Sequence, residues 1–137
     1  MLTQGELIVR YEGVQSFLTE GCLFLCLCSI AEQVMGQKID ILDTIRYCKR
    51  MGYIDSKNEM TEEGQCMYLR DLTGKVWERE EFKNLPAVVP DNMYTVEKWV
   101  NPNTGYTHFK RRFVDTLKNS VTVRDGYMIG YYGYIHG

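Results

Sequence analysis

The chain has 137 residues, of which 45% are hydrophobic, 12% aromatic and 25% charged, and its formal net charge is −2. This length fits one domain with a substantial core, and it excludes a barrel enzyme or a two-domain cofactor enzyme. The near-neutral charge gives no argument for binding nucleic acid or an anionic membrane surface, and the aromatic content excludes a disordered chain. We therefore expect a single domain over residues 1–137.

The first predicted element is a buried helix. Residues 22–35 are apolar nearly all round, which is typical of a central helix covered on every side, and Gly36 suits its C-terminus. The longest apolar stretch, residues 22–31, covers about ten residues, whereas a membrane span needs roughly 20. Residues 1–10 lack the apolar run of a signal peptide. We expect a cytoplasmic protein without membrane contact.

Two further helices are expected before the chain changes its pattern. Residues 40–51 have helical spacing of apolar side chains, and Asp40 suits the N-cap. Residues 62–73 form a shorter helix, with Thr61 as its N-cap and Gly74 just beyond its end.

The second half of the chain has the alternating pattern of strands. The expected strands are residues 75–79, 87–89, 94–100, 106–114, 120–124 and 127–135. A strong turn signal, Asn101 to Gly105, separates two of them. Helices followed by an antiparallel sheet predict the α+β class, with an N-terminal helical layer, including a buried central helix, packed on a C-terminal sheet.

The cysteines number five: Cys22, Cys26, Cys28, Cys48 and Cys66. An odd number without regular spacing is a poor disulfide framework, so a reducing compartment is expected. The C-x3-C-x-C spacing at the start of the buried helix does not fit the paired ligands of a tetrahedral zinc site. We expect no metal and no cofactor, and we interpret Cys26, Cys28 and Cys48 as packing residues.

Cys22 is the candidate nucleophile. At the start of the predicted helix its thiol would face free N–H groups and the positive end of the helix dipole, which favour the thiolate, although Glu20 opposes this. A thiol nucleophile needs a base, and His108 lies early in a predicted strand. A hairpin that turns near Thr116 would bring Asp125 opposite His108, where its carboxylate could orient the imidazole.

Gln15 is the candidate oxyanion donor. It precedes Cys22 in a segment that must lead to the helix, so its amide could point to the place where the oxyanion forms. The alternative is that Gln15 is an ordinary exposed glutamine without a catalytic role. For Asp125 the alternative is that Asp125-Gly126 is only a turn dipeptide.

These motifs resemble the papain-like cysteine peptidase clan. The resemblance depends on four short motifs: Val14-Gln15, Gly21-Cys22 followed by the apolar helix, Thr107-His108-Phe109, and Asp125 near the end of a strand. The likeness is closest to the compact branch of bacteriocin-leader-type peptidases and their small phage, spirochaete and other bacterial relatives. It implies a papain-like fold and a triad of Cys22, His108 and Asp125, with Gln15 as the oxyanion donor.

The chain also departs from the familiar pattern of that branch. Leu23-Phe24 stand where Gly-Pro usually follows the cysteine, and Gly126 stands where a proline usually follows the aspartate. The stretch from Val114 to Val123 is similar to one in small phage and spirochaete members, and on that alignment Asp115 is the third triad member. Asp115 would reach His108 only if the chain folds back sharply, so geometry favours Asp125.

The sequence thus predicts a cysteine peptidase or amidase-like hydrolase that attacks an amide bond through a Cys-His-Asp triad. The rival hypothesis is a catalytically decayed papain-like binding protein, for example a phage or mobile-element effector that binds a host protein. In either case the expected partner is a peptide or a protein.

Overall fold

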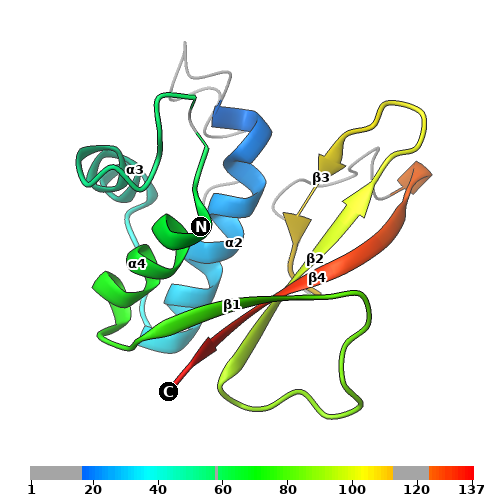
Figure 1. Ribbon diagram of the computed structural model, residues 1–137. Coiled ribbons are helices and arrows are strands. Elements are labelled where there is room, and N and C mark those ends of the chain that lie inside the picture. Colours follow the sequence, from blue (N-terminus) through cyan, green and yellow to red (C-terminus); the bar gives the residue numbers. More distant parts are fainter. Residues whose placement is uncertain (1–16, 58, 113–123) are drawn as a thin grey trace.

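The protein combines a helical layer with a four-stranded antiparallel sheet (Figure 1). The structure, a computed structural model, describes residues 17–57, 59–112 and 124–137. In chain order its elements are α2 (Phe17–Met35), α3 (Ile41–Arg50), α4 (Glu62–Thr73), β1 (Trp77–Phe82), β2 (Met93–Val100), β3 (Thr107–Lys110) and β4 (Tyr127–His136). The predicted α+β class is confirmed.

Helix α2 is the central element of the core. Its side chains from Cys22 to Ala31 are buried, apart from the half-buried Ser29, because both the other helices and the sheet cover it. The helix ends at Met35, and Gly36 has the positive φ of 69° that a glycine adopts without strain. Within the described residues, none of the helices has the length and hydrophobicity needed to cross a membrane.

Both shorter helices begin where the sequence predicted. Asp40 accepts a hydrogen bond from the backbone N–H of Asp43 at 3.1 Å, and Thr61 accepts one from that of Gly64 at 2.9 Å. Helix α4 ends at Gly74, whose φ of 73° is left-handed. These bonds satisfy N–H groups that have no partner inside the helix, which is why capping residues locate a helix start so well.

The sheet has the strand order β1-β4-β2-β3, with all neighbours antiparallel. The last strand of the chain is therefore central, and it pairs with β1 on one side and with β2 on the other. The predicted turn from Asn101 to Gly105 is confirmed, since the Gly105 N–H bonds to the Asn101 carbonyl at 2.8 Å. The predicted strand at residues 87–89 is wrong, because these residues lie in the loop between β1 and β2 and Val88 is 80% exposed.

A bulge interrupts the pairing of β2 with β4. Lys98 lies opposite Gly130, but the next residue, Trp99, lies opposite Met128, so Ile129 has no counterpart on β2. An extra residue of this kind increases the local twist and bends the strand. The bulge therefore shapes the end of the sheet that lies next to β3.

Candidate active site at Cys22 and the outer strand

The thiol of Cys22 lies against the outer strand of the sheet. The backbone N–H of Phe109 donates a hydrogen bond to the Cys22 Sγ at 3.5 Å, although the two residues are 87 positions apart in the chain. Among the described residues β3 pairs with β2 alone, and α2 contacts β3 along its other edge. The Cys22 residue is only 2% exposed.

His108 is the residue next to this contact. It lies in β3, directly before Phe109, and is 4% exposed. Backbone geometry limits the distance from the Cys22 Sγ to the His108 Cα to about 6 Å, since one peptide unit separates that Cα from the Phe109 nitrogen. The fold thus brings together the two residues that the sequence singled out as nucleophile and base.

The two neighbours in β3 direct their side chains to opposite faces of the sheet. The Phe109 ring stacks on Tyr132 at 5.4 Å between centroids, within the core under the helices. By strand alternation the His108 side chain lies on the other face, which it shares with Lys110. The thiol itself meets the backbone N–H of Phe109 at the strand edge, one peptide unit from the His108 Cα.

The predicted place of Cys22 at the helix N-terminus is wrong. Helix α2 begins at Phe17, so the backbone N–H of Cys22 is inside the helix and not one of its free N–H groups. Gly21 looked like a boundary, but a glycine costs a helix only about 1 kcal/mol relative to alanine. Burial of the apolar residues that follow Gly21 offsets this cost.

The predicted pairing of Asp125 with His108 is also wrong. Trp99 lies opposite His108, and strand β2 separates β3 from β4, which Asp125 precedes. Asp125 is exposed, and its carboxylate pairs with the Arg124 guanidinium through two contacts of 3.1 Å. The hydrogen bond from Arg124 lowers the pKa of this carboxyl group, so the observed partner of Asp125 is its neighbour in the chain.

Two other predicted site residues cannot be placed. Gln15, the candidate oxyanion donor, and Asp115, the alternative third member, lie outside the described residues. The second histidine, His136, lies in β4, and its ring meets Trp77 edge-on with a centroid distance of 4.9 Å.

A polar cluster on the His108 face was missed by the sequence analysis. The Glu97 carboxylate accepts hydrogen bonds from the Lys110 ammonium at 3.2 Å and from the Trp99 indole at 3.0 Å. The side chains of Glu97 and Lys110 are only 11% and 14% exposed. The turn from Asn101 to Gly105 could have revealed the pair, since it sets Glu97 opposite Lys110.

Three of the remaining cysteines have the packing role that the sequence predicted. Cys26, Cys28 and Cys48 are buried packing residues, and all five cysteines are free thiols. Burial raises the pKa of Cys48 to about 12 and moves that of Cys28 further up. Among the described residues no group of three His, Cys, Asp or Glu side chains could hold a metal ion.

The fold and the site together define an α+β protein in which a helix thiol meets the open edge of a sheet beside a histidine. A scan against protein-family models and searches of curated proteins and of solved structures found no match to this chain. A functional assignment therefore depends on the residues of this chain alone.

Proposed function

We propose that the protein is a papain-like thiol hydrolase, a cysteine peptidase or amidase that cleaves an amide bond. The proposal depends on one observation, the hydrogen bond from the Phe109 N–H to the Cys22 Sγ, which brings the thiol next to His108. A helix cysteine meeting a strand histidine is the arrangement on which papain-like catalysis depends, and the α+β order of the elements is compatible with it.

In the proposed reaction His108 takes the proton of the Cys22 thiol, and the thiolate attacks the carbonyl carbon of the amide. The tetrahedral intermediate collapses when His108 returns the proton to the leaving amine, which produces a thioester on Cys22. Water then attacks the thioester, with His108 again as the base, and releases the acid. Gln15 is proposed to donate a hydrogen bond to the oxyanion.

The third member of the triad is proposed to be Asp115. The alternative, Asp125, is exposed, paired with Arg124 and separated from His108 by a strand, which argues against an orienting role. Asp115 lies outside the described residues and follows Lys110, the last residue of β3, by five positions in the sequence.

The proposed substrate is a peptide or protein, and the proposed reaction needs no cofactor. We also propose a cytoplasmic location, which five free cysteines support, because thiols stay reduced in that compartment.

Alkylation of the thiol tests the proposal. A free cysteine is only about 0.3% ionised at pH 6, so fast reaction with iodoacetamide at this pH reports a thiolate stabilised by an imidazolium. We expect peptide mapping to locate the label on Cys22, and His108→Gln to slow the reaction. The matched controls are Cys22→Ser and Cys66→Ser, since burial raises the pKa of the half-buried Cys66 thiol and should leave it unreactive. If Cys22 reacts with iodoacetamide no faster than free cysteine does, the proposed catalytic function is refuted.

A second candidate is a binding protein on the same fold without catalysis. The near-complete burial of Cys22 and its place within α2 favour it, because a nucleophile must be reached by its substrate. In that case Cys22 packs like Cys26, and it reacts with iodoacetamide at pH 6 only after unfolding. The same alkylation experiment therefore separates the two functions.

A further inference from the structure

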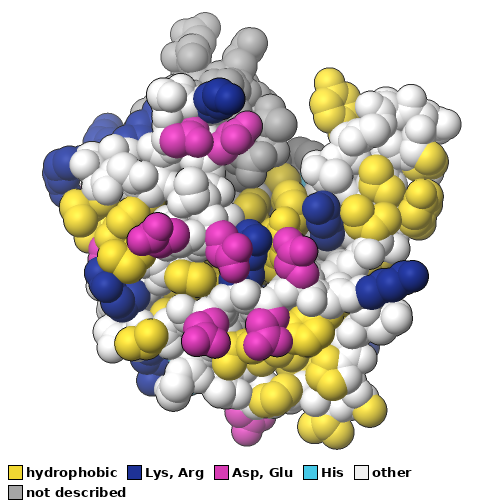
Figure 2. Space-filling model, in the orientation of Figure 1, with side chains coloured by type: hydrophobic (Ala, Val, Ile, Leu, Met, Phe, Trp, Pro, Cys, Tyr) yellow, Lys and Arg dark blue, Asp and Glu magenta, His cyan; other side chains and the backbone are white. Residues whose placement is uncertain are grey.

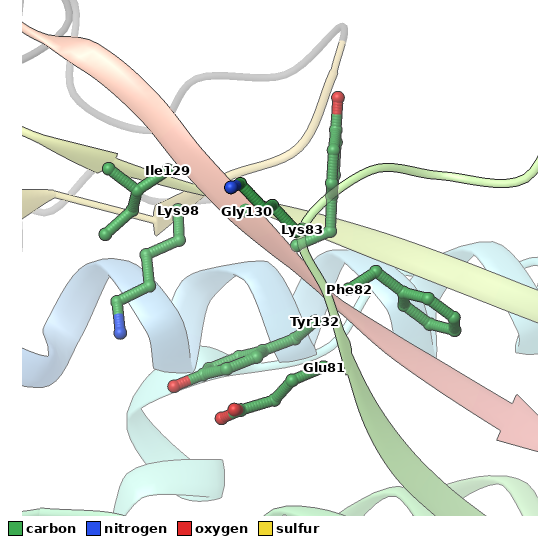
Figure 3. A pocket seen from close by; sticks show the side chains of 8 residues that line it. Glu81, Phe82, Lys83, Lys98, Ile129, Gly130 and Tyr132 are labelled. Atoms are coloured by element: carbon green, nitrogen blue, oxygen red, sulfur yellow. The ribbon is translucent and has the colours of Figure 1, made fainter.

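A pocket of about 250 Å³ lies where β1 ends and the bulge of β4 begins (Figure 3). Its lining includes Glu81, Phe82, Lys83, Lys98, Gly130 and Tyr132. Gly130 allows the two strands to come this close, since a Cβ added there would lie 2.8 Å from the Phe82 carbonyl oxygen. The pocket is therefore built into the backbone of the sheet.

Three polar side chains of this pocket extend on one side of the sheet. Tyr132 lies opposite both Glu81 and Val96, and Lys98 follows Val96 by two positions, so alternation places all of them on the same face. Figure 3 shows the side chains of Lys98, Tyr132 and Glu81 extending in the same direction. In Figure 2 hydrophobic and charged side chains gather between the helical part and the sheet.

The ammonium of Lys98 lies among aromatic rings. Its Nζ is 5.7 Å from the centroid of the Tyr132 ring and 5.9 Å from that of Phe109, and the residue is half-buried. Within the described part of the chain, Lys98 has no carboxylate at ion-pair distance. Ring faces attract a cation without neutralising it, so Lys98 presents an uncompensated positive charge to the pocket.

The acidic group of the pocket does not supply the missing partner. The Glu81 carboxylate lies 3.5 Å from the Arg79 guanidinium, which also meets Glu62 at 3.2 Å. Lys83 adds a second cation to the lining. The charge around the pocket therefore favours an anionic group, and a flat carboxylate suits its size and its aromatic wall.

The pocket lies close to the candidate nucleophile. Lys98 is directly opposite Phe109, whose amide contacts the Cys22 Sγ. Side chains facing each other across two strands have their Cβ atoms about 5 Å apart, and an extended peptide advances roughly 3.3 Å per residue. A peptide held at Cys22 thus reaches the Lys98 pocket within about three residues.

We infer that Lys98 is a specificity-determining residue that binds a carboxylate of the peptide substrate, either an acidic side chain or the C-terminal group. This inference rests on the proposed function, because it takes the peptide cleaved at Cys22 as the ligand. The protein accordingly prefers peptides with a negative charge a few residues from the scissile bond.

Binding to the full chain carrying Cys22→Ser tests this without any turnover. Three probe peptides are compared by NMR titration: acetyl-Ala-Glu-Ala-Ala-amide, acetyl-Ala-Gln-Ala-Ala with a free C-terminal carboxylate, and neutral acetyl-Ala-Gln-Ala-Ala-amide. We expect one charged peptide to bind about tenfold more tightly than the neutral one, with the preference weakening in high salt. Which charged peptide is preferred identifies the source of the carboxylate.

The variants separate a pocket effect from a general charge effect. Lys98→Met keeps the unbranched stem between the rings and should abolish the preference, whereas Lys75→Met removes an exposed lysine outside the pocket and should retain it. Equal binding of all three peptides, or a preference that survives Lys98→Met, would overturn the inference. Because alkylation of Cys22 is measured separately, a failure here is distinct from a failure of the proposed catalysis.

Discussion

The Tyr134 hydroxyl donates a hydrogen bond of 2.7 Å to the Gln65 Oε1, and both residues are almost completely buried. The same Gln65 oxygen accepts a bond from Arg79 at 3.2 Å, and the Gln65 amide nitrogen donates to the Met60 carbonyl at 3.1 Å. Gln65 thereby links α4 to both β1 and the central strand β4. The hydrogen bond holds the helical layer against the sheet. It thereby also supports the contact between α2 and β3.

Replacing this hydroxyl should therefore weaken the whole fold. Tyr134→Phe removes the donor and leaves the buried Gln65 oxygen with Arg79 alone, so we expect a loss of about 1–2 kcal/mol in the free energy of unfolding. Urea denaturation measures it. Tyr106→Phe, at an exposed residue, is the matched control and should change nothing measurable. An unchanged midpoint in Tyr134→Phe would show that the bond does not hold the layers together.

The buried pair of Glu97 and Lys110 gives a second prediction. Glu97→Gln leaves the Lys110 ammonium without its carboxylate in a largely dry place, and we expect a loss of about 2–3 kcal/mol in the free energy of unfolding. Adding Lys110→Met removes the uncompensated charge and should recover much of that loss. A double-mutant cycle on the exposed pair of Arg46 and Asp43 is the control, and we expect its coupling free energy to be below about 0.5 kcal/mol. Similar couplings in the two cycles would contradict this account.

Asp71 predicts a pH dependence of stability. Burial alone would raise the pKa of its carboxyl group, but hydrogen bonds from the hydroxyls of Tyr47 and Tyr53 and from Arg70 outweigh this and lower the pKa. A carboxyl whose pKa is lower in the folded state stabilises the protein above its unfolded pKa, near 4, and this contribution disappears as the pH falls through the folded value.

The measurement compares the wild type with Asp71→Asn in urea denaturation from pH 6 to pH 2.5. We expect Asp71→Asn to be less stable at pH 6, by on the order of 1 kcal/mol after solvent screening, and the difference to shrink below pH 4. Asp91→Asn, at an exposed loop residue, should show no such convergence. A difference that stays constant over the whole range would exclude the ionised carboxylate as its cause.

The choice between the two aspartates is the fourth prediction. If Asp115 orients His108, Asp115→Asn should slow the alkylation of Cys22 at pH 6 by at least about tenfold. Asp125→Asn should leave the rate unchanged, because the Asp125 carboxylate is exposed and paired with Arg124. The opposite pattern would mean that the Asp125 segment moves toward β3 in solution.

Much of the local structure was predictable from neighbouring residues. Asp40, Thr61 and Gly74 mark helix ends because each makes its hydrogen bond within a few positions of itself. The turn from Asn101 to Gly105 is equally local. Residues 87–89 show the limit, since a short apolar run becomes a strand only if another strand lies beside it.

The site was predictable only in part. Cys22 and His108 were singled out from the sequence, and the fold brings their segments together. The partner of His108 was predicted from a hairpin with a strand at residues 120–124, of which 120–123 lie outside the described residues. The strand order β1-β4-β2-β3 sets Trp99 opposite His108 instead. The cluster at Glu97 and the pocket at Lys98 depend on that strand order as well.

In the described part of the chain the sequence by itself determined the three helices, most of the strands and the α+β class, because apolar periodicity, caps and turns act over a few residues. Only the tertiary structure decided that α2 begins before Gly21, that β4 is the central strand and that Asp125 lies away from His108. These features follow from the burial of apolar side chains that are distant in the chain. Local hydrogen-bonding rules contain no information about such contacts.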